Sequence, residues 1–263
     1  MSVAVLIVNF RTPDLTVEAI RSVLSEPEVT EIVVVENGSG DDSFERISKA
    51  IEGEMRVTVI KSIENLGFGR GNNLGAEHAT ADFLFLLNSD ATLHAGALST
   101  LLTNWQTLET PGILAPAIRM PDGHTLQLDT FGIMPTAKRL LSRATKRSDP
   151  DWLEPDWVSG CAMLLKRADF EAVGGFDSDV FMYYEDVLLC RAIRGLGRTI
   201  HRCLEASVTH LGGASASGST AQKKQYYAAQ DVLLSKIGEP VLLRMLVRIA
   251  RWPNLWIGKL LRR

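Results

Sequence analysis

The sequence predicts an α/β fold built on a mostly parallel central sheet, and two observations support this. Short β-branched, apolar runs alternate with helical patterns through the first half of the chain, and polar segments follow these runs. Of the 263 residues, 46% are hydrophobic and 22% are charged, which is enough to fill a large core. We therefore expect a folded catalytic or binding domain rather than a disordered chain.

The first strand is expected at Val3–Val8, followed by Thr12-Pro13-Asp14, a sequence typical of a helix start. The apolar run is too short for a signal peptide and no positive charge precedes it, so it is interpreted as a buried strand. The other elements expected in this half are strands at Ile32–Val35, Val57–Ile60, Phe83–Leu87 and near Ile113–Ala115, and helices at Gly71–Thr80 and over roughly 95–109.

The second half is less regular over residues 116–156, where the basic run from Lys138 to Arg147 is interpreted as a solvated surface. Gly212–Ser219 indicates a flexible loop, which divides a domain of residues 1–215 from a helical extension of residues 216–263. The elements expected here are strands at Val158–Leu165, Thr199–His201 and Ala206–Thr209, helices at Arg167–Val173 and from Glu185 to Gly195 or Gly197, and a helical segment from Ala221 that breaks at Trp252-Pro253.

Composition excludes several classes of protein. The net charge of −3 argues against a dedicated nucleic-acid binder, so no nucleic-acid partner is expected. Cys161, Cys190 and Cys203 form no CxxC pair, which favours buried thiols in a reducing cytoplasm over disulfides or a zinc site. No apolar stretch reaches the ~18 residues of a membrane span. We expect a cytoplasmic protein that is soluble or lies on a membrane surface.

Polar residues follow four of the expected strands. They are Asn9, then Glu36-Asn37-Gly38-Ser39, then the segment Asn65–Gly75, and finally Asn88-Ser89-Asp90. Because ligands bind at the carboxyl ends of strands in open parallel sheets, we expect all four segments to face one crevice.

Two of these segments suggest phosphate chemistry. The glycine-rich Asn65–Gly75 loop can offer backbone N–H groups to a phosphate, with Arg70 as a diphosphate partner. It does not fit GxGxxG, which disfavours a nicotinamide-dependent oxidoreductase. Asp90, released from a buried strand, can hold a hard divalent cation that bridges two phosphates.

Two further motifs lie in the second half. Glu185-Asp186 follows the aromatic segment Phe181–Tyr184, so a partly apolar pocket is expected to raise a carboxyl pKa towards that of a useful general base. Since successive helical residues point about 100° apart, at most one of the two carboxylates faces the crevice. His210, before Gly212-Gly213, is a core histidine, a metal ligand or a phosphate contact.

Taken together, these segments resemble family 2 glycosyltransferases, which are inverting enzymes of the GT-A fold, and especially their rhamnosyltransferase-like members. The resemblance covers roughly residues 3–213. The segments that carry it are Ile7-Val8-Asn9-Phe10, Val35–Ser39, Asn65–Gly75, Leu87–Asp90, Trp157–Gly160, Gly175-Phe176-Asp177, Phe181–Asp186 and His210–Gly213.

The resemblance implies a Rossmann-like GT-A domain, a nucleotide-sugar donor, and Mg²⁺ or Mn²⁺ held by Asp90 and His210. It implies Asp186 as the catalytic base. The residues that would contact the nucleotide sugar are Asn9, Glu36, Asn37, Gly67, Arg70, Asn73, Asn88, Ser89 and Asp90, and those expected in the acceptor pocket are Trp157, Gly160, Tyr184 and Glu185.

Three positions depart from the family pattern. Glu36 is one methylene longer than the usual Asp, and Asn88 replaces the first Asp of a strict DxD motif. Leu188 stands where many members have a further Asp, a change that could remove a salt bridge or an acceptor contact.

By resemblance, the expected reaction is transfer of L-rhamnose from dTDP-rhamnose to a glycan or lipid-linked acceptor in bacterial cell-surface polysaccharide synthesis. UDP-hexose and UDP-galactofuranose remain open as donors. A catalytically silent sugar-nucleotide-binding partner subunit is the alternative from another class, and a homodimer is also open.

The C-terminal segment has its own charge pattern. Residues 241–263 contain no acid, and their basic residues are Arg244, Arg248, Arg251, Lys259, Arg262 and Arg263. The first three fall on one helical face with aliphatic residues over the rest, and Trp252 and Trp256 add interfacial character. This pattern predicts a peripheral contact with anionic membrane at the inner face of the plasma membrane. Packing against the catalytic domain or a second subunit is the alternative.

Overall fold

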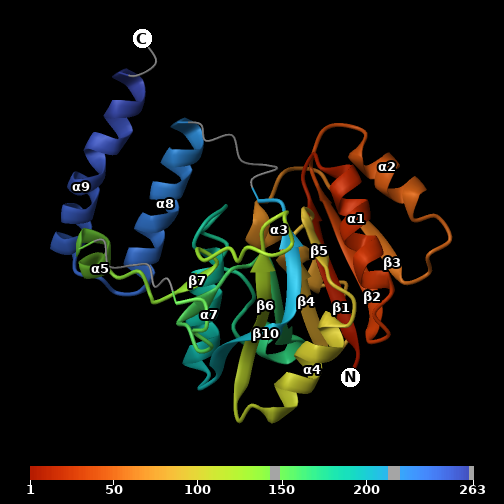
Figure 1. Ribbon diagram of the computed structural model, residues 1–263. Helices are drawn as coiled ribbons and strands as arrows, with labels where there is room; N and C mark the ends of the chain where they lie inside the picture. Colours follow the sequence, from red (N-terminus) through yellow and green to blue (C-terminus); the bar gives the residue numbers. More distant parts are fainter. Residues whose placement is uncertain (143–148, 213–219, 261–263) are drawn as a thin grey trace.

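The computed structural model describes residues 1–142, 149–212 and 220–260, with side chains described as far as Arg251 (Figure 1). Parts of the predicted basic run and of the Gly212–Ser219 loop lie outside these residues. The first half contains β1 (Val3–Asn9), α1 (Pro13–Leu24), β2 (Val29–Asn37), α2 (Ser43–Ala50), β3 (Val57–Ser62), α3 (Phe68–Ala76), β4 (Phe83–Leu87), β5 (Ala91–Leu93), α4 (Ala97–Thr107) and β6 (Pro111–Arg119).

The second half contains two small strands, a long strand and the C-terminal helices. Its elements are β7 (Phe131–Gly132), α5 (Ala137–Ser142), β8 (Trp157–Val158), β9 (Ala162–Lys166), α6 (Arg167–Ala172), α7 (Glu185–Gly195), β10 (Thr199–His210), α8 (Thr220–Lys236) and α9 (Val241–Leu260). The large sheet has the order β3-β2-β1-β4-β9-β6-β10-β5, and β7 pairs with β8 in a second, small sheet.

The predicted α/β architecture is confirmed, with helices on both faces of the large sheet (Figure 1). Alternate residues of β1 point to opposite faces. Val5 and Ile7 join the core cluster that includes residues of α1 and α4, whereas Ala4 and Leu6 join the one that includes residues of α6 and α7. A strand buried on both sides explains why its sequence is a continuous apolar run.

The directions of the strands bring the ends of β4 and β10 to the same edge of the large sheet. The strands β3, β2, β1 and β4 are parallel, β9 runs antiparallel between β4 and β6, and β10 is parallel to β6. Consequently β10 runs in the same direction as β4, and its last residue, His210, reaches the edge where β4 ends. The short β5 pairs antiparallel with β10, with Ala91 opposite His210, which brings Asp90 beside that histidine.

Two predicted strand assignments were wrong. Val158–Leu165 is not a single strand, because β8 belongs to the small sheet, β9 belongs to the large one, and the chain crosses between them at Ser159–Cys161. Gly160 passes so close to Phe68 that a Cβ would lie 2.7 Å from its Cε1. Conversely, Thr199–His201 and Ala206–Thr209 are one strand, β10, which continues across an irregularity between Cys203 and Ser207. The helix α2 had no prediction.

The predicted helix break at Trp252-Pro253 was also wrong, since α9 runs through this position to Leu260. The break lies at Gly238-Glu239-Pro240. Gly238 has a φ of +79°, which ends α8 with little cost for a glycine, and Pro240 suits the start of the next helix. The Glu239 carboxylate accepts a hydrogen bond from the backbone N–H of Ala137 (2.9 Å) and ties this turn to α5.

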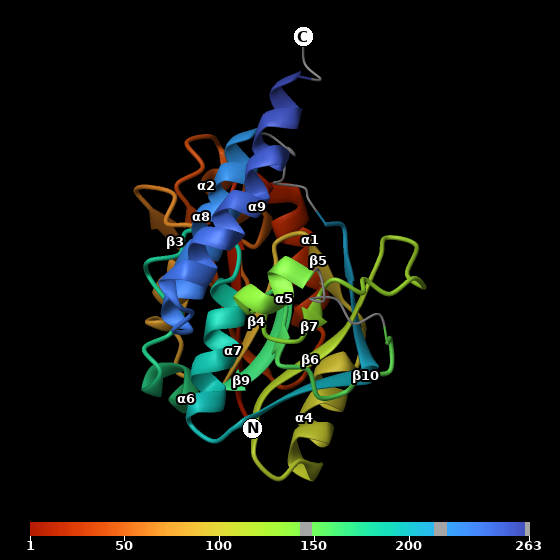
Figure 2. The same cartoon turned by 90° about the vertical axis from the view of Figure 1, so that its left-hand side faces the viewer.

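The helices α8 and α9 lie side by side at the end of the molecule away from β3 (Figures 1 and 2). Part of the predicted arginine face of α9 packs against α8 instead of facing solvent. Arg251 is 8% exposed, pairs with Asp231 and donates to the carbonyl of Tyr227 (2.9 Å). Arg248 pairs with the same carboxylate at 3.0 Å. These two positive charges therefore hold the two helices together.

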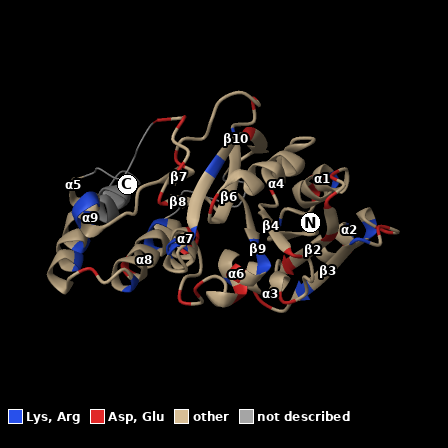
Figure 3. Ribbon diagram, turned by 90° about the horizontal axis from the view of Figure 1, so that it is seen from below, with Lys and Arg blue, Asp and Glu red and all other residues tan. Residues whose placement is uncertain are grey.

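The outer side of α9 carries an exposed aliphatic stripe, whose members are between 42% and 69% exposed. They are Val241, Leu242, Met245, Leu246 and Ile249. Figure 3 shows the basic residues of α8 and α9 in blue. Among the described residues, no helix is both long enough and apolar enough to cross a membrane.

Asp231→Ala should lower the free energy of unfolding by about 2–3 kcal/mol, because it leaves the buried Arg251 guanidinium without its partner. Urea denaturation measures this loss. Asp179→Ala is the matched control and should lower the free energy of unfolding far less, since Asp179 pairs with Lys236 at the solvent-exposed surface. Equal losses in the two variants would contradict this account of α9.

Candidate active site

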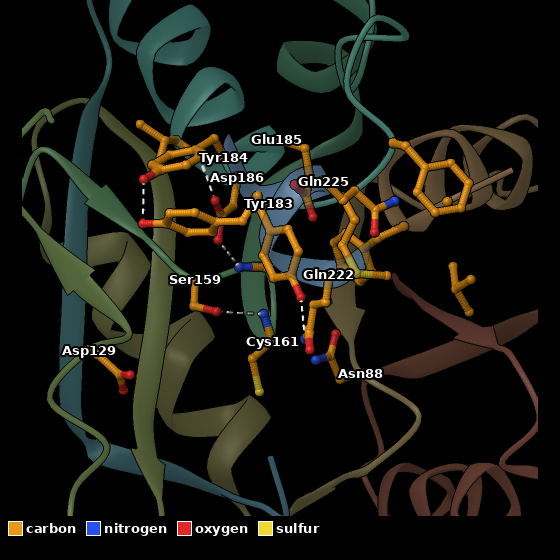
Figure 4. Close-up of a pocket in the computed structure, with 18 of the residues that line it drawn as sticks. Asn88, Asp129, Ser159, Cys161, Tyr183, Tyr184, Glu185, Asp186, Gln222 and Gln225 are labelled. Atoms are coloured by element: carbon orange, nitrogen blue, oxygen red, sulfur yellow. Dashed lines mark hydrogen bonds between the residues drawn. The ribbon is translucent and has the colours of Figure 1, made fainter. Parts of the chain in front are cut away.

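A cavity of about 1090 Å³ lies at the carboxyl edge of the large sheet (Figure 4). It is lined by residues from both halves of the chain, and three of the four predicted polar segments reach it through Asn37, Asn65 and Gly67, and Asn88–Asp90, whereas Asn9 does not. The predicted site residues that line it are Asn37, Gly67, Asn88, Ser89, Asp90, Trp157, Gly160, Tyr184, Glu185, Asp186 and His210.

One end of the cavity is built around Asp90 and His210. The Asp90 carboxylate lies 3.1 Å from His210 Nε2, and both side chains are mostly buried. Gln127 Oε1 lies 3.0 Å from the other ring nitrogen, Nδ1, which fixes the orientation of the imidazole. Burial alone would lower the pKa of His210, but hydrogen bonds with Asp90 and Cys161 raise it to about 10.

These two side chains suit a divalent cation as part of its ligand set once the cation displaces the proton of His210, because an imidazole ligates a metal through a deprotonated nitrogen. A carboxylate oxygen and an imidazole nitrogen converge on one space, and Asn88 lies beside them with Nδ2 3.3 Å from His210 Nε2. Among the described residues no group of three His, Cys, Asp or Glu side chains comes together around a cation position. The remaining ligands would therefore come from a bound diphosphate and water.

The glycine-rich loop is held against the segment that precedes α7. Gly67 has a φ of +81°, and its missing side chain lets the loop approach Phe181, whose carbonyl oxygen would lie 2.1 Å from a Cβ. That carbonyl accepts the N–H of Phe68 (3.2 Å). The Asn37 amide donates to the Gly67 carbonyl (3.1 Å) and its oxygen accepts the N–H of Leu66 (3.0 Å). The glycine-rich loop is thus hydrogen-bonded both to Asn37 and to the segment before α7.

Four predicted donor residues lie outside the lining of this cavity and make structural contacts. Asn9 is fully buried and accepts hydrogen bonds from Thr12 and Thr16 at the start of α1. Glu36 accepts the N–H of Ser39 at 2.8 Å. The other two are Asn73, whose amide bonds both the N–H and the carbonyl of Phe176, and Arg70, which is exposed and pairs with Glu64 at 3.9 Å. Roles in donor binding stay predictions for all four.

The Asp186 carboxylate also lines the cavity. It accepts the backbone N–H of Gly160 at 3.2 Å and that of Val187 at 2.8 Å. Burial raises the pKa of this carboxyl, and the two N–H groups oppose the shift because they stabilise the charged form. The segment that crosses between the two sheets therefore supplies a hydrogen bond that orients Asp186.

The neighbouring carboxyl group of Glu185 lacks the two hydrogen bonds that Asp186 accepts. It is 7% exposed, and its Oε2 has no hydrogen-bond partner among the described residues. Burial and the charge of Asp186 raise the pKa of Glu185 to about 8. Because only Asp186 has two N–H donors, we assign the negative charge of the pair to Asp186 and the proton to Glu185 at neutral pH.

The structure adds cavity residues that were not among the predicted site residues. Tyr183, Ser159 and Cys161 lie next to predicted positions, whereas Gln222, Gln225 and Tyr226 come from α8 (Figure 4). No motif marks the α8 residues, because polar side chains on a surface helix look like ordinary solvent-exposed ones.

The structure also explains why Leu188 departs from the family pattern. Leu188 is buried in a cluster with Ala229 and Leu233 of α8, so an apolar side chain suits this position.

A family model described as glycosyl transferase family 2 matches residues 4–174, which include the Asn65–Gly75 loop and Asp90. The chain belongs to glycosyl transferase family 2. It is a glycosyltransferase with the GT-A fold, as the resemblance implied. The match stops before Glu185, so it does not test the residues at the Asp186 end of the cavity.

Two curated relatives extend the comparison. The succinoglycan biosynthesis protein ExoU of Rhizobium meliloti is 26% identical over 246 residues, which cover 89% of this chain and 69% of the relative. The N-acetylglucosaminyl-diphospho-decaprenol L-rhamnosyltransferase of Mycobacterium tuberculosis is 29% identical over 189 residues. That match covers 59% of this chain and 58% of the relative, so the chain spans little more than half the length of this enzyme.

Solved structures show the same fold at low sequence identity. The mannosyltransferase PcManGT of Pyrobaculum calidifontis, in complex with GDP-Man and Mn²⁺, has a TM-score of 0.66 at 17% identity and covers 94% of this chain and 68% of its own. GalNAc-T7 with UDP, GalNAc and Mn²⁺ also has a TM-score of 0.66, at 16% identity, over 88% of this chain and 48% of its own.

Glu185→Gln should make the stability of this glycosyltransferase less dependent on pH. The folded-state pKa of Glu185 is raised above its unfolded value, so its contribution is present at low pH and is lost as the pH rises towards about 8. Between pH 5 and 8, the free energy of unfolding of wild type should fall relative to that of the variant by on the order of 2 kcal/mol. Glu54→Gln, at an exposed position, is the control. Parallel pH curves for wild type and Glu185→Gln would exclude the proposed protonation.

Proposed function

We propose that this glycosyltransferase transfers L-rhamnose from dTDP-rhamnose to a hydroxyl group of a lipid-linked glycan, with inversion and in a single displacement. The arrangement that carries the proposal is one cavity lined both by the Asp90–His210 pair and by the Asp186 carboxylate, which accepts the N–H of Gly160. A bacterial relative named as a diphospho-decaprenol L-rhamnosyltransferase supports the choice of donor and acceptor.

The donor end offers both cation ligands and backbone donors to a nucleoside diphosphate. A divalent cation, Mg²⁺ or Mn²⁺, would neutralise charge on the departing diphosphate when bound at Asp90 and His210. Mn²⁺ is present in the two structural neighbours described above, which favours a cation in this reaction. Asn37, Gly67 and Ser89 would orient the donor beside it.

The acceptor end offers a base in a protected place. Asp186 would accept the proton from the acceptor hydroxyl as that oxygen attacks the anomeric carbon from the face opposite the diphosphate. The raised pKa of Asp186 brings it closer to the pKa of an effective base at neutral pH. Protonated Glu185 would donate a hydrogen bond to the acceptor, and the Trp157 and Tyr184 rings would pack against its sugar.

A thermal-shift panel of nucleotide sugars, with and without Mn²⁺, tests the donor. We expect dTDP-rhamnose to raise the melting temperature more than UDP-hexoses or UDP-galactofuranose, because a ligand that binds only the folded state stabilises it. A larger shift with a UDP-sugar would move the assignment to that donor. Binding of a donor without turnover on any acceptor would instead favour the silent partner subunit.

Asp90→Ala should remove the Mn²⁺-dependent part of dTDP-rhamnose binding, because this carboxylate is the hard ligand of the proposed cation site. Isothermal titration calorimetry with and without Mn²⁺ measures it. Asp129→Ala is the control, since Asp129 also lines the cavity but belongs to none of the predicted donor motifs. Metal-dependent affinity that survives in Asp90→Ala would exclude Asp90 as the ligand.

Asp186→Asn should lower kcat by ~10²–10⁴-fold while donor affinity is retained, because the amide cannot accept the proton. The assay measures release of dTDP from dTDP-rhamnose in Mn²⁺, with a prenyl-diphosphate-linked N-acetylglucosamine as acceptor. Calorimetry on the same variant measures donor affinity. A kcat within a few-fold of wild type would mean that another group is the base.

We also propose that residues 241–263 bring the enzyme to the inner face of the membrane, where a lipid-linked acceptor would reside. The aliphatic stripe of α9 would insert among the lipids, since Arg248 and Arg251 are engaged by Asp231. The other basic residues of the segment would add attraction to anionic lipid.

Leu246→Ser should weaken binding to liposomes of mixed anionic and neutral lipid by about tenfold or more, because the buried area of a leucine side chain is lost. Arg248→Gln should change it by less than about twofold, because this arginine already pairs with Asp231. Co-sedimentation measures both. A larger effect of Arg248→Gln than of Leu246→Ser would indicate that the basic face of α9, rather than the aliphatic stripe, contacts the lipid. Absence of liposome binding by wild type would exclude a membrane contact.

A further inference from the structure

The turn that precedes the candidate base has an unusual backbone. Tyr183 and Tyr184 have φ values of +73° and +66°, and α7 starts at the next residue. Side chains other than glycine rarely adopt this left-handed conformation, and two in succession need support from their surroundings. The direction in which α7 leaves this turn determines where Asp186 points.

The support comes from α8, whose contacting residues lie 39 to 46 residues further along the chain. Gln222 Nε2 donates to the Tyr183 hydroxyl at 2.5 Å. The Tyr184 hydroxyl donates to that of Tyr226 at 2.5 Å and accepts Gln230 Nε2 at 2.7 Å. The Tyr226 ring also packs on both tyrosines, with centroid distances of 5.5 Å and 5.1 Å. We call Gln222, Tyr226 and Gln230 the α8 clamp.

Apolar packing joins the same two helices beyond the turn. Val187 and Leu188, which directly follow Asp186, are buried in a cluster with Ala229 and Leu233 of α8. Asp186 is therefore flanked on both sides along the chain by residues that α8 holds. The Asp186 carboxylate itself accepts a hydrogen bond from the N–H of Gly160, and close packing on Phe68 fixes the position of this glycine.

We propose that the α8 clamp positions the base by holding Tyr183 and Tyr184 in the left-handed conformation from which α7 starts. Gln222, Tyr226 and Gln230 are positioning residues in this proposal, and it rests on the proposed role of Asp186. It gives the C-terminal extension a function within the active site. That function is separate from the membrane contact of α9.

Two variants at one position separate the backbone from the side chain. Tyr184→Gly and Tyr184→Ala both lose the ring and the hydroxyl, but only glycine adopts a positive φ without cost. Tyr184→Ala should therefore have a kcat about tenfold below that of Tyr184→Gly, with the same KM for dTDP-rhamnose. Equal kcat values in the two variants would overturn the proposal.

A milder variant tests the contact itself. Tyr226→Phe keeps the ring packing and removes the hydroxyl, so kcat should fall about fivefold with the donor KM unchanged. Lys223→Ala, at an exposed position of α8, is the matched control and should retain wild-type kcat. If Tyr226→Phe lowers only the melting temperature and leaves kcat at the wild-type value, α8 has a packing role alone and the proposal fails.

Hydrogen exchange measured by mass spectrometry gives a readout that needs no substrate. In full-length Tyr226→Phe, the backbone amides of residues 185–189 should exchange faster than in wild type, while those of β1 should not change. Should wild type turn over no nucleotide sugar, the proposed function fails and exchange alone decides: faster exchange at residues 185–189 supports the clamp, and unchanged exchange overturns it.

Discussion

The reversed direction of β9 is the constraint on which the arrangement of the active site depends. Because β9 runs antiparallel between β4 and β6, its first residue lies at the edge where β4 ends. The segment Ser159–Cys161 must therefore cross this edge, where Gly160 donates to Asp186 and the Cys161 carbonyl accepts the N–H of Asn88. One change of strand direction thus connects the proposed base to the strand end that carries Asp90.

The Asp90–His210 pair and the Glu185–Asp186 pair both line the cavity, but their charges are balanced differently. Asp90 is balanced by a histidine whose pKa is raised, so this pair holds opposite charges in contact. Glu185 and Asp186 are two adjacent acids with little solvent, so at neutral pH Glu185 keeps its proton and only Asp186 is charged. An enzyme that separates a diphosphate from a sugar needs both kinds of environment, namely one that stabilises negative charge and one that can accept a proton.

Local sequence patterns predicted the strands well where burial is strong on both faces. Phe83–Leu87 matches β4 at both ends, and the polar residues after the strands do meet at one edge. The errors arose where distant contacts decide the structure. The strand β8 ends just before Gly160, which packs closely on Phe68, and Arg251 of α9 faces inward because its partner Asp231 lies on another helix. Neither partner is visible in the sequence around the residue concerned. The contribution of α8 to the cavity was missed for the same reason.

The contact of Gly67 with Phe181 has a consequence for kinetics. The loop at the donor end and the turn that leads to Asp186 share a backbone hydrogen bond and leave no room for a side chain between them. A ligand that orders one of these segments therefore changes the free energy of ordering the other. Binding at the proposed donor site and binding at the proposed acceptor site are therefore coupled equilibria, which favours an ordered sequence of substrate binding.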